Sequence, residues 1–216
     1  MAIDDPGAAF KFVGGSLCLD FINTVSGRGP NPAALAGERD YADIVEKERL
    51  VGFDDLMRWG RAAGVLTRAE AAELERAARA GPAHASQVMG RARGLRQAMY
   101  RVFTAVIERW KPDATDLAVL NRELGRARAH ERLTSGMRGI AWTWNAGGRD
   151  LDRILWPTVR SAADLLTSDE LKRLRQCDGE DCRWLFLDTS KNRSRRWCEM
   201  ADCGNRAKVR RFRRRH

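Results

Sequence analysis

The sequence has no run of eighteen apolar residues, so no segment has the length and composition of a membrane-spanning helix. Its first residues lack the basic start and apolar stretch of a secretory leader, and we therefore expect a cytoplasmic protein. It contains no Walker-type phosphate loop, no dinucleotide fingerprint and no serine nucleophile elbow. His84 and His130 have neither a carboxylate nor a second histidine at ligand spacing. These absences indicate a protein that is not an enzyme.

Four of the five cysteines lie near the carboxyl end. Four residues separate Cys177 from Cys182 and again Cys198 from Cys203, with fifteen residues between the two pairs. Two short pairs around a longer insert supply the tetrahedron of soft ligands that structural zinc prefers, with no position left open for a catalytic water. Disulfides and unrelated buried thiols are the alternatives, but the sequence shows no trait of a secreted protein. We therefore predict one structural Zn²⁺ held by these four cysteines.

Positive charge is concentrated in the same part of the chain. The 216 residues include 39 Lys and Arg against 29 Asp and Glu. Of these, 15 basic and 6 acidic residues fall within residues 171–216, which gives this stretch a net charge of +9 and leaves residues 1–170 at +1. One Zn²⁺ with four thiolates would lower the local charge to about +7. This asymmetry predicts a polyanion-binding end attached to a domain with another task.

The residues around the cysteines predict a small zinc-binding fold. Residues 183–188 alternate as a strand that places Trp184 and Phe186 on one face, and residues 195–197 are expected as the return strand. Residues 204–212 are typical of a helix, mostly covered by basic side chains. Its remaining stripe consists of Asn205, Val209 and Phe212. A knuckle, a hairpin and a helix that carries the last ligand form a treble-clef arrangement.

Two segments resemble known families. Cys198–x4–Cys203–Gly204–Asn205–Arg206 resembles the CGNR zinc finger of bacterial proteins, as do residues 184–190 and 192–198. This resemblance implies a treble-clef-like zinc site in a DNA-binding transcription regulator. Residues 12–24, with the pattern F-V-G-G-x-L-x-L-D-F-x-N-T, resemble the opening of the ABATE domain. That domain commonly precedes the CGNR finger and is described as a stress-induced transcription regulator; the similarity extends to about residue 166.

The rest of the chain is mostly helical in pattern. Thr67 and Glu70 form a capping box before an alanine-rich helix, and residues 85–111 give the longest helical signal. Residues 133–144 alternate as a hairpin, and Pro157 either kinks a helix over residues 150–166 or marks its first turn. We expect a mainly α protein with a small β-hairpin, in the α+β class. A helical ABATE-like domain would occupy residues 1–167 and a treble-clef-like zinc finger residues 168–216.

A ligand pocket in the helical domain is a second hypothesis. Asp20 and Asn23 are polar residues within an apolar helix, and Trp142 and Trp144 share one face of the hairpin. Satisfaction of nearby backbone for the polar pair and a place in the core for the tryptophans are the alternatives. Together, the four residues are candidates for a small-molecule effector site. The domain would then sense an effector or form a homodimer.

Three functions are compatible with the basic end. The first is a DNA-binding transcription regulator, and the second is an RNA-binding or ribosome-associated protein in which Trp184, Phe186 and Trp197 stack on unpaired bases. The third is a zinc-stabilised module for an acidic protein partner. The candidate nucleic-acid contacts are Arg193, Arg195, Arg196, Arg206, Lys208, Arg210, Arg211, Arg213 and Arg214. We favour DNA as the partner, with RNA as the alternative.

Overall fold

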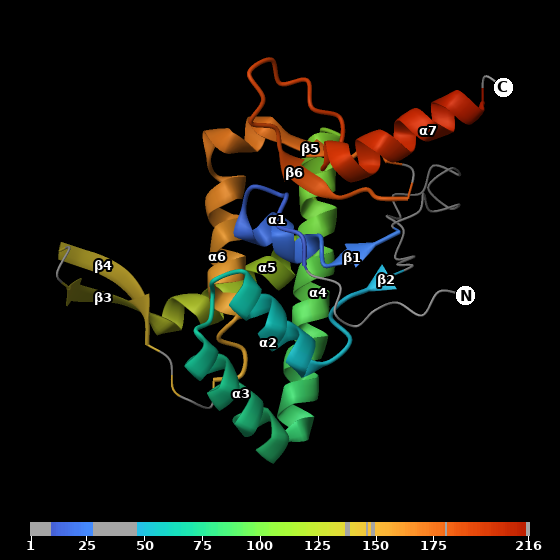
Figure 1. Cartoon of the computed structure of the whole chain (residues 1–216). Coiled ribbons are helices and arrows are strands. Elements are labelled where there is room, and N and C mark those ends of the chain that lie inside the picture. Colours follow the sequence, from blue (N-terminus) through green and yellow to red (C-terminus); the bar gives the residue numbers. More distant parts are fainter. Residues whose placement is uncertain are drawn as a thin grey trace.

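The computed structural model describes residues 10–27, 47–136, 139–145, 147, 150–179 and 181–214. Helices dominate these residues and the strands form short antiparallel pairs, which confirms the expected mainly α, α+β class (Figure 1). The helices are α1 (Leu17–Ile22), α2 (Phe53–Ala62), α3 (Arg68–Ala80), α4 (Pro82–Ile107), α5 (Ala114–His130), α6 (Leu155–Leu166) and α7 (Asn205–Arg213). The paired strands are β1 (Val25–Ser26) with β2 (Lys47–Glu48), β3 (Glu131–Gly136) with β4 (Gly139–Trp144), and β5 (Leu174–Gln176) with β6 (Leu185–Leu187).

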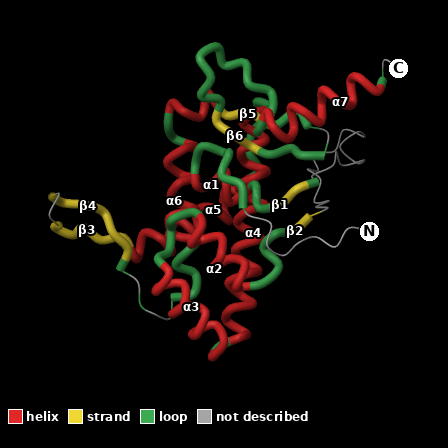
Figure 2. The backbone as a smooth tube through the Cα atoms, viewed as in Figure 1, coloured by secondary structure: helices red, strands yellow, loops and turns green. Residues whose placement is uncertain are grey.

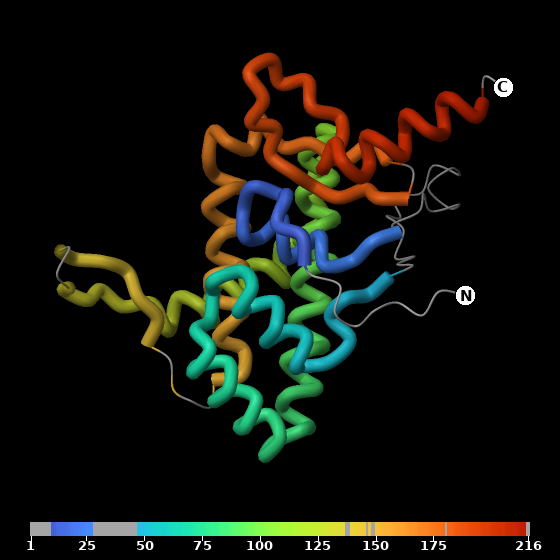
Figure 3. Tube along the Cα trace, in the orientation of Figure 1, coloured from blue at the N-terminus to red at the C-terminus, as the bar shows by residue number. Residues whose placement is uncertain are grey.

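Helix α4 forms the spine of the core. Helices α1, α2, α3, α5 and α6 all contact it, and its inward side chains, among them Val88, Leu95 and Phe103, are buried (Figures 1 and 3). The helix begins at Pro82, three residues before the predicted start. Proline suits this place because its missing N–H is one of the donors that a helix start leaves unpaired.

Local sequence rules position the helix ends. The predicted capping box forms, because Thr67 Oγ1 accepts from Glu70 N at 3.2 Å and Glu70 Oε2 accepts from Thr67 N at 2.7 Å. Gly64, at a φ of +70°, turns the chain between α2 and α3. Pro157 lies in the first turn of α6, as one of the two predicted readings requires.

Strand β6 belongs to two hydrophobic clusters at once. Leu185 and Leu187 join the core of the helical part, whereas Trp184 and Phe186 pack with the cysteines, so the predicted two-residue alternation is confirmed. The expected return strand over residues 195–197 is wrong. β6 pairs instead with β5, and the backbone around residue 195 bonds elsewhere: Arg195 N donates to a carboxylate and Arg196 O accepts from Asp178 N.

The β3–β4 hairpin leaves the body of the molecule as an arm (Figure 2). Its register pairs Gly136 with Gly139, and residues 137–138 between them lie outside the described residues. Trp144 packs against the core, but Trp142 is 63% exposed, so the prediction of a core position is wrong for Trp142. Residues 26–40 are rich in glycine, proline and asparagine, a composition that predicts a loop, and all but the first two lie outside the described residues. Among the described helices, none is both long and apolar enough to cross a bilayer.

Candidate metal centre and nucleic-acid interface

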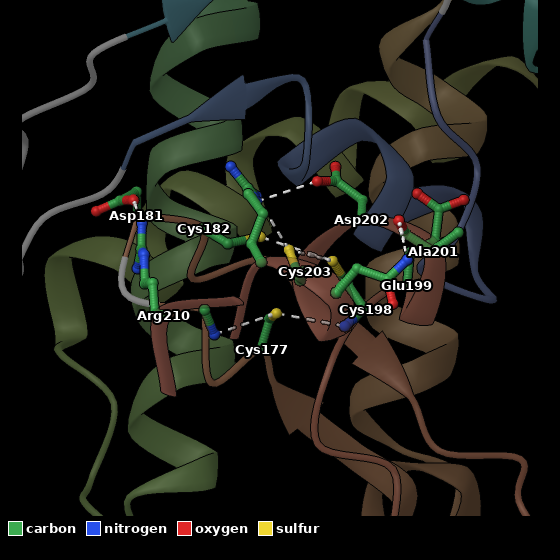
Figure 4. Close-up of polar contacts among 12 residues, drawn as sticks. Cys177, Asp181, Cys182, Cys198, Glu199, Ala201, Asp202, Cys203 and Arg210 are labelled. Atoms are coloured by element: carbon green, nitrogen blue, oxygen red, sulfur yellow. Dashed lines mark hydrogen bonds and ion pairs between the residues drawn. The ribbon is translucent and has the colours of Figure 1, made fainter. Parts of the chain in front are cut away.

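The four predicted zinc ligands converge on one point. Their Sγ atoms all lie within 4.8 Å of one another, and each cysteine is at most 5% exposed (Figure 4). Cys177 directly follows β5, and Cys182 lies three residues before β6. Cys198 precedes a π-helical turn over Met200–Gly204, which contains Cys203 and leads into α7. All four thiols are free, so the disulfide alternative is excluded.

The geometry fits a zinc tetrahedron. A zinc–sulfur bond of about 2.3 Å implies sulfur–sulfur edges of about 3.8 Å. The Cys182–Cys198 and Cys198–Cys203 Sγ distances are both 3.6 Å. The N–H groups of Gly179 and Cys198 point at Cys177 Sγ, at 3.4 and 3.3 Å, which stabilises a thiolate there.

Gly179 is needed where the first cysteine pair closes on itself. A Cβ atom at this position would lie 3.0 Å from Cys182 Cβ and 3.4 Å from Cys203 Sγ. The contact with Cys182 is tighter than ordinary van der Waals packing, so this predicted ligand would have to shift, and the contact with Cys203 leaves no spare room. The hydrogen in place of a side chain therefore lets the first knuckle approach the second.

The electrostatics of the cluster call for a cation. The pKa of the Cys177 thiol is held well below its usual value because Cys182 and Cys198 donate hydrogen bonds to it. The pKa values of Cys182 and Cys198 are raised, first because each would give up its hydrogen bond to the Cys177 thiolate on ionising. A buried sulfur cluster thus resists carrying several negative charges, and a divalent ion removes this resistance. Arg206 contributes one positive group, with Nη2 at 3.2 Å from Cys203 Sγ.

A buried carboxylate organises the loop between β6 and the second cysteine pair. Asp188 is 1% exposed and accepts from Ser190 N at 2.9 Å, Ser190 Oγ at 2.6 Å and Arg195 N at 3.0 Å. The Arg195 guanidinium turns back over the Phe186 ring, 4.5 Å from its centroid, and donates to Trp197 O and Cys198 O. Arg195 therefore holds the knuckle together.

The metal centre is joined directly to the amino-terminal segment. The Asn23 side chain acts as a strand partner for Leu185: its Nδ2 donates to Leu185 O at 2.8 Å and its Oδ1 accepts from Leu185 N at 3.0 Å. Trp184 Nε1 donates to Val25 O at 2.6 Å, and Leu187 N donates to Gly14 O at 2.8 Å. Strand β6 and the neighbouring Trp184, which lie between the two cysteine pairs, are therefore hydrogen-bonded to the segment around α1, and Leu185 and Leu187 share its hydrophobic core.

The structure separates the four residues of the predicted ligand pocket. Asp20 accepts from Gly14 N at 2.8 Å and Asn23 bonds Leu185, which is the alternative of backbone satisfaction. Burial raises the pKa of Asp20 to about 6. Trp142 and Trp144 lie on the arm, which stands apart from α1 (Figure 1). None of the four lines the cavity of about 770 Å³ between α2, α3 and α4.

The inner face of α7 is neutralised by acidic residues. Arg206, Arg210 and Arg214 line a cleft of about 350 Å³ together with Asp178 and Asp181. Arg210 pairs with Asp181 (Figure 4), and Arg206 Nε lies 3.1 Å from Asp202. Outside α7, Arg196 Nε donates to Asp178 at 2.6 Å. The pairing of Arg196 with Asp178 and of Arg210 with Asp181 was not predicted, although each aspartate is adjacent in sequence to a cysteine of the first pair.

The outer face of α7 is different. Lys208 and Arg213 are exposed there, and Arg211 is exposed where α7 borders the cleft. No carboxylate in the described part of the chain pairs with any of the three. The stripe between these cations is open as well, since Val209 is 50% and Phe212 65% exposed. Figure 1 shows α7 projecting from the body of the molecule.

Two of the three aromatic residues proposed for base stacking are inaccessible. Trp184 is 6% and Phe186 0% exposed, because both pack on the cysteine cluster. The prediction that they stack on unpaired bases is therefore wrong. Trp197 is half-buried and lies beneath the Arg196 guanidinium, 5.3 Å from it.

Comparison with known families agrees with this geometry. Residues 15–169 match the ABATE model, described as "Putative stress-induced transcription regulator". Residues 173–216 match the CGNR zinc finger. Neither description is that of an enzyme, and no curated protein matches the sequence. The CGNR match and the four clustered cysteines together support one structural zinc ion.

Proposed function

Because the chain belongs to the ABATE family and ends in a CGNR zinc finger, we propose that it is a transcription regulator that binds duplex DNA. Cys177, Cys182, Cys198 and Cys203 are the proposed zinc ligands. The metal would fix the knuckle from which α7 starts, since so small a module has little core of its own. The carrying observation is that Lys208, Arg211 and Arg213 of α7 are exposed and pair with no carboxylate among the described residues.

The described ion pairs divide the candidate contacts into two groups. Arg195, Arg196, Arg206 and Arg210 bond to backbone or acidic groups of the chain itself, and we assign them to holding the finger together. The proposed phosphate contacts are the exposed Arg193, Lys208, Arg211 and Arg213, together with Arg214, which lies at the carboxyl end of α7 and also lines the cleft. Phosphate contacts of this kind position a protein on DNA without reading its sequence.

Duplex DNA is favoured over single-stranded RNA because two of the three aromatic residues considered for base stacking are buried. Trp184 and Phe186 are buried, and stacking on aromatic side chains is a major source of affinity for unpaired bases. A helix with an open outer face is instead a shape that the major groove of B-DNA admits.

The test is the salt dependence of binding. Fluorescence anisotropy with the zinc-loaded, full-length protein and a labelled duplex should give log K falling by roughly 4 to 5 per decade of salt, because about five phosphates are contacted. A slope near zero would exclude the proposed mode. Tighter binding of a single-stranded RNA of equal length would support the RNA alternative instead.

A charge-matched pair of variants locates the contact surface. Lys208→Gln/Arg211→Gln/Arg213→Gln should lower the salt slope by roughly 3 and weaken binding to all duplexes alike. The control, Arg68→Gln/Arg76→Gln/Arg79→Gln, removes the same charge from exposed positions on α3 and should retain the slope. Equal losses in both variants would mean that net charge alone, and not α7, determines binding.

A further inference from the structure

The β3–β4 arm carries one apolar face and one polar face. The register places Leu133 opposite Trp142 and Ser135 opposite Ile140, and directly opposed residues of an antiparallel pair point to the same side. Leu133, Ile140 and Trp142 therefore lie on one face, which we call the arm face. They are 60%, 77% and 63% exposed. The other face carries Arg132, Thr134, Ala141 and Thr143.

The base of the arm is held firmly against the body. The His130 ring stacks on Trp156 with centroids 3.8 Å apart, and Trp144 approaches the same indole at 6.0 Å. Asn145 N donates to His130 O at 2.8 Å, and Arg160 pairs with Glu131. The arm is thus fixed in direction while its apolar face stays open (Figures 1 and 2).

The apolar composition of the arm face indicates which kind of partner it can bind. A two-stranded hairpin is at best marginally stable in water unless its hydrophobic face is covered. None of the described residues of β3 and β4 on the arm face is a cation, so they offer a polyanion no attraction. The three side chains expose on the order of 450 Å² per chain, more than half of the roughly 800 Å² per partner that a specific interface buries. An uncharged apolar patch is also complementary to itself.

We propose that the arm is a homodimerisation element, in which two copies of the chain pack their arm faces together across a two-fold axis. An isologous contact of this kind uses the same patch on both subunits and is the commonest route to a closed dimer. A contact of about this area lies at the small end of specific interfaces, so the dimer is expected to be in exchange with monomer. This association does not depend on DNA binding by the finger.

Sedimentation velocity of the full-length, zinc-loaded protein tests the proposal, over concentrations from about 0.1 to about 100 µM. The wild type should form a dimer. Ile140→Ser/Trp142→Ser should raise the dimer Kd by on the order of 100-fold or more, because each buried anchor is lost twice per dimer. The control, Val51→Ser/Trp110→Ser, removes one β-branched aliphatic and one indole side chain from other exposed positions and should remain dimeric.

Two results would overturn the proposal. The first is a wild type that sediments as a monomer over the whole range, whatever else binds the arm face. The second is a dimer that survives Ile140→Ser/Trp142→Ser as well as it survives the control. Leu133→Lys, on the neighbouring strand, provides a second disruption by placing like charges face to face, and it should also give monomers. Zinc content and the unfolding temperature confirm that each variant is folded.

Discussion

Replacing Asn23 with alanine should detach β6 from α1. The Asn23 amide satisfies both backbone groups of Leu185, at 2.8 and 3.0 Å, and all of these groups are buried. Removing it leaves one donor and one acceptor without a partner, and each such loss costs about 1–3 kcal/mol. We therefore expect the free energy of unfolding to fall by about 3 kcal/mol, out of roughly 5–15 kcal/mol for a domain of ordinary stability.

Thermal unfolding followed by circular dichroism measures this loss. For a chain of this length, about 3 kcal/mol corresponds to a fall in Tm of roughly 6–12 °C. Hydrogen exchange adds a local readout, because the amide of Leu185 should lose its protection first. The control is Asn121→Ala, at an exposed position on α5, which should change stability by less than about 0.5 kcal/mol. An Asn23→Ala variant as stable as this control would refute the assigned role.

Three further substitutions test individual features of the structure. Burial raises the pKa of Asp20 to about 6. The free energy of unfolding of the wild type should therefore fall, relative to that of Asp20→Asn, by about 2 kcal/mol as the pH rises from about 4 to about 7. A difference in urea unfolding that does not change with pH would contradict this. Gly179→Ala should weaken zinc binding about tenfold in a chelator competition, because the new Cβ would lie too close to Cys182 Cβ. The control Gly125→Ala, which has open space around the new Cβ, should bind zinc as tightly as the wild type. Asp188→Ala should lower the free energy of unfolding by about 2–4 kcal/mol, since Ser190 N, Ser190 Oγ and Arg195 N lose a charged, buried acceptor. A loss below about 1 kcal/mol in urea unfolding would count against it.

Features encoded within a few residues could be predicted from the sequence. The capping box at Thr67 depends on contacts between neighbours along the chain. The alternation of Trp184 and Phe186 follows from the two-residue period of a strand. The zinc site could be predicted for the same reason, because each cysteine pair is a short local motif and the thiol ligands at this spacing are typical of structural zinc.

Features that depend on distant partners could not be predicted. Strand β5 forms because its backbone pairs with β6, on the other side of the first cysteine pair. Residues 195–197 do not form the expected strand, because Arg195 N donates its hydrogen bond to Asp188 and not to a neighbouring strand. Asn23 meets Leu185 across 162 positions of sequence. The exposure of Trp142 could not be predicted either. Its hydrophobicity suggests a core position, and it is exposed only because the arm points away from the body of the protein.

Native mass spectrometry of the full-length protein gives the most direct test of the zinc-centred account. One zinc ion per chain is expected, with all four clustered cysteines protected from alkylation until a chelator removes the metal. A folded chain that carries no zinc, or in which Cys177, Cys182, Cys198 and Cys203 react freely while the metal is bound, would contradict it.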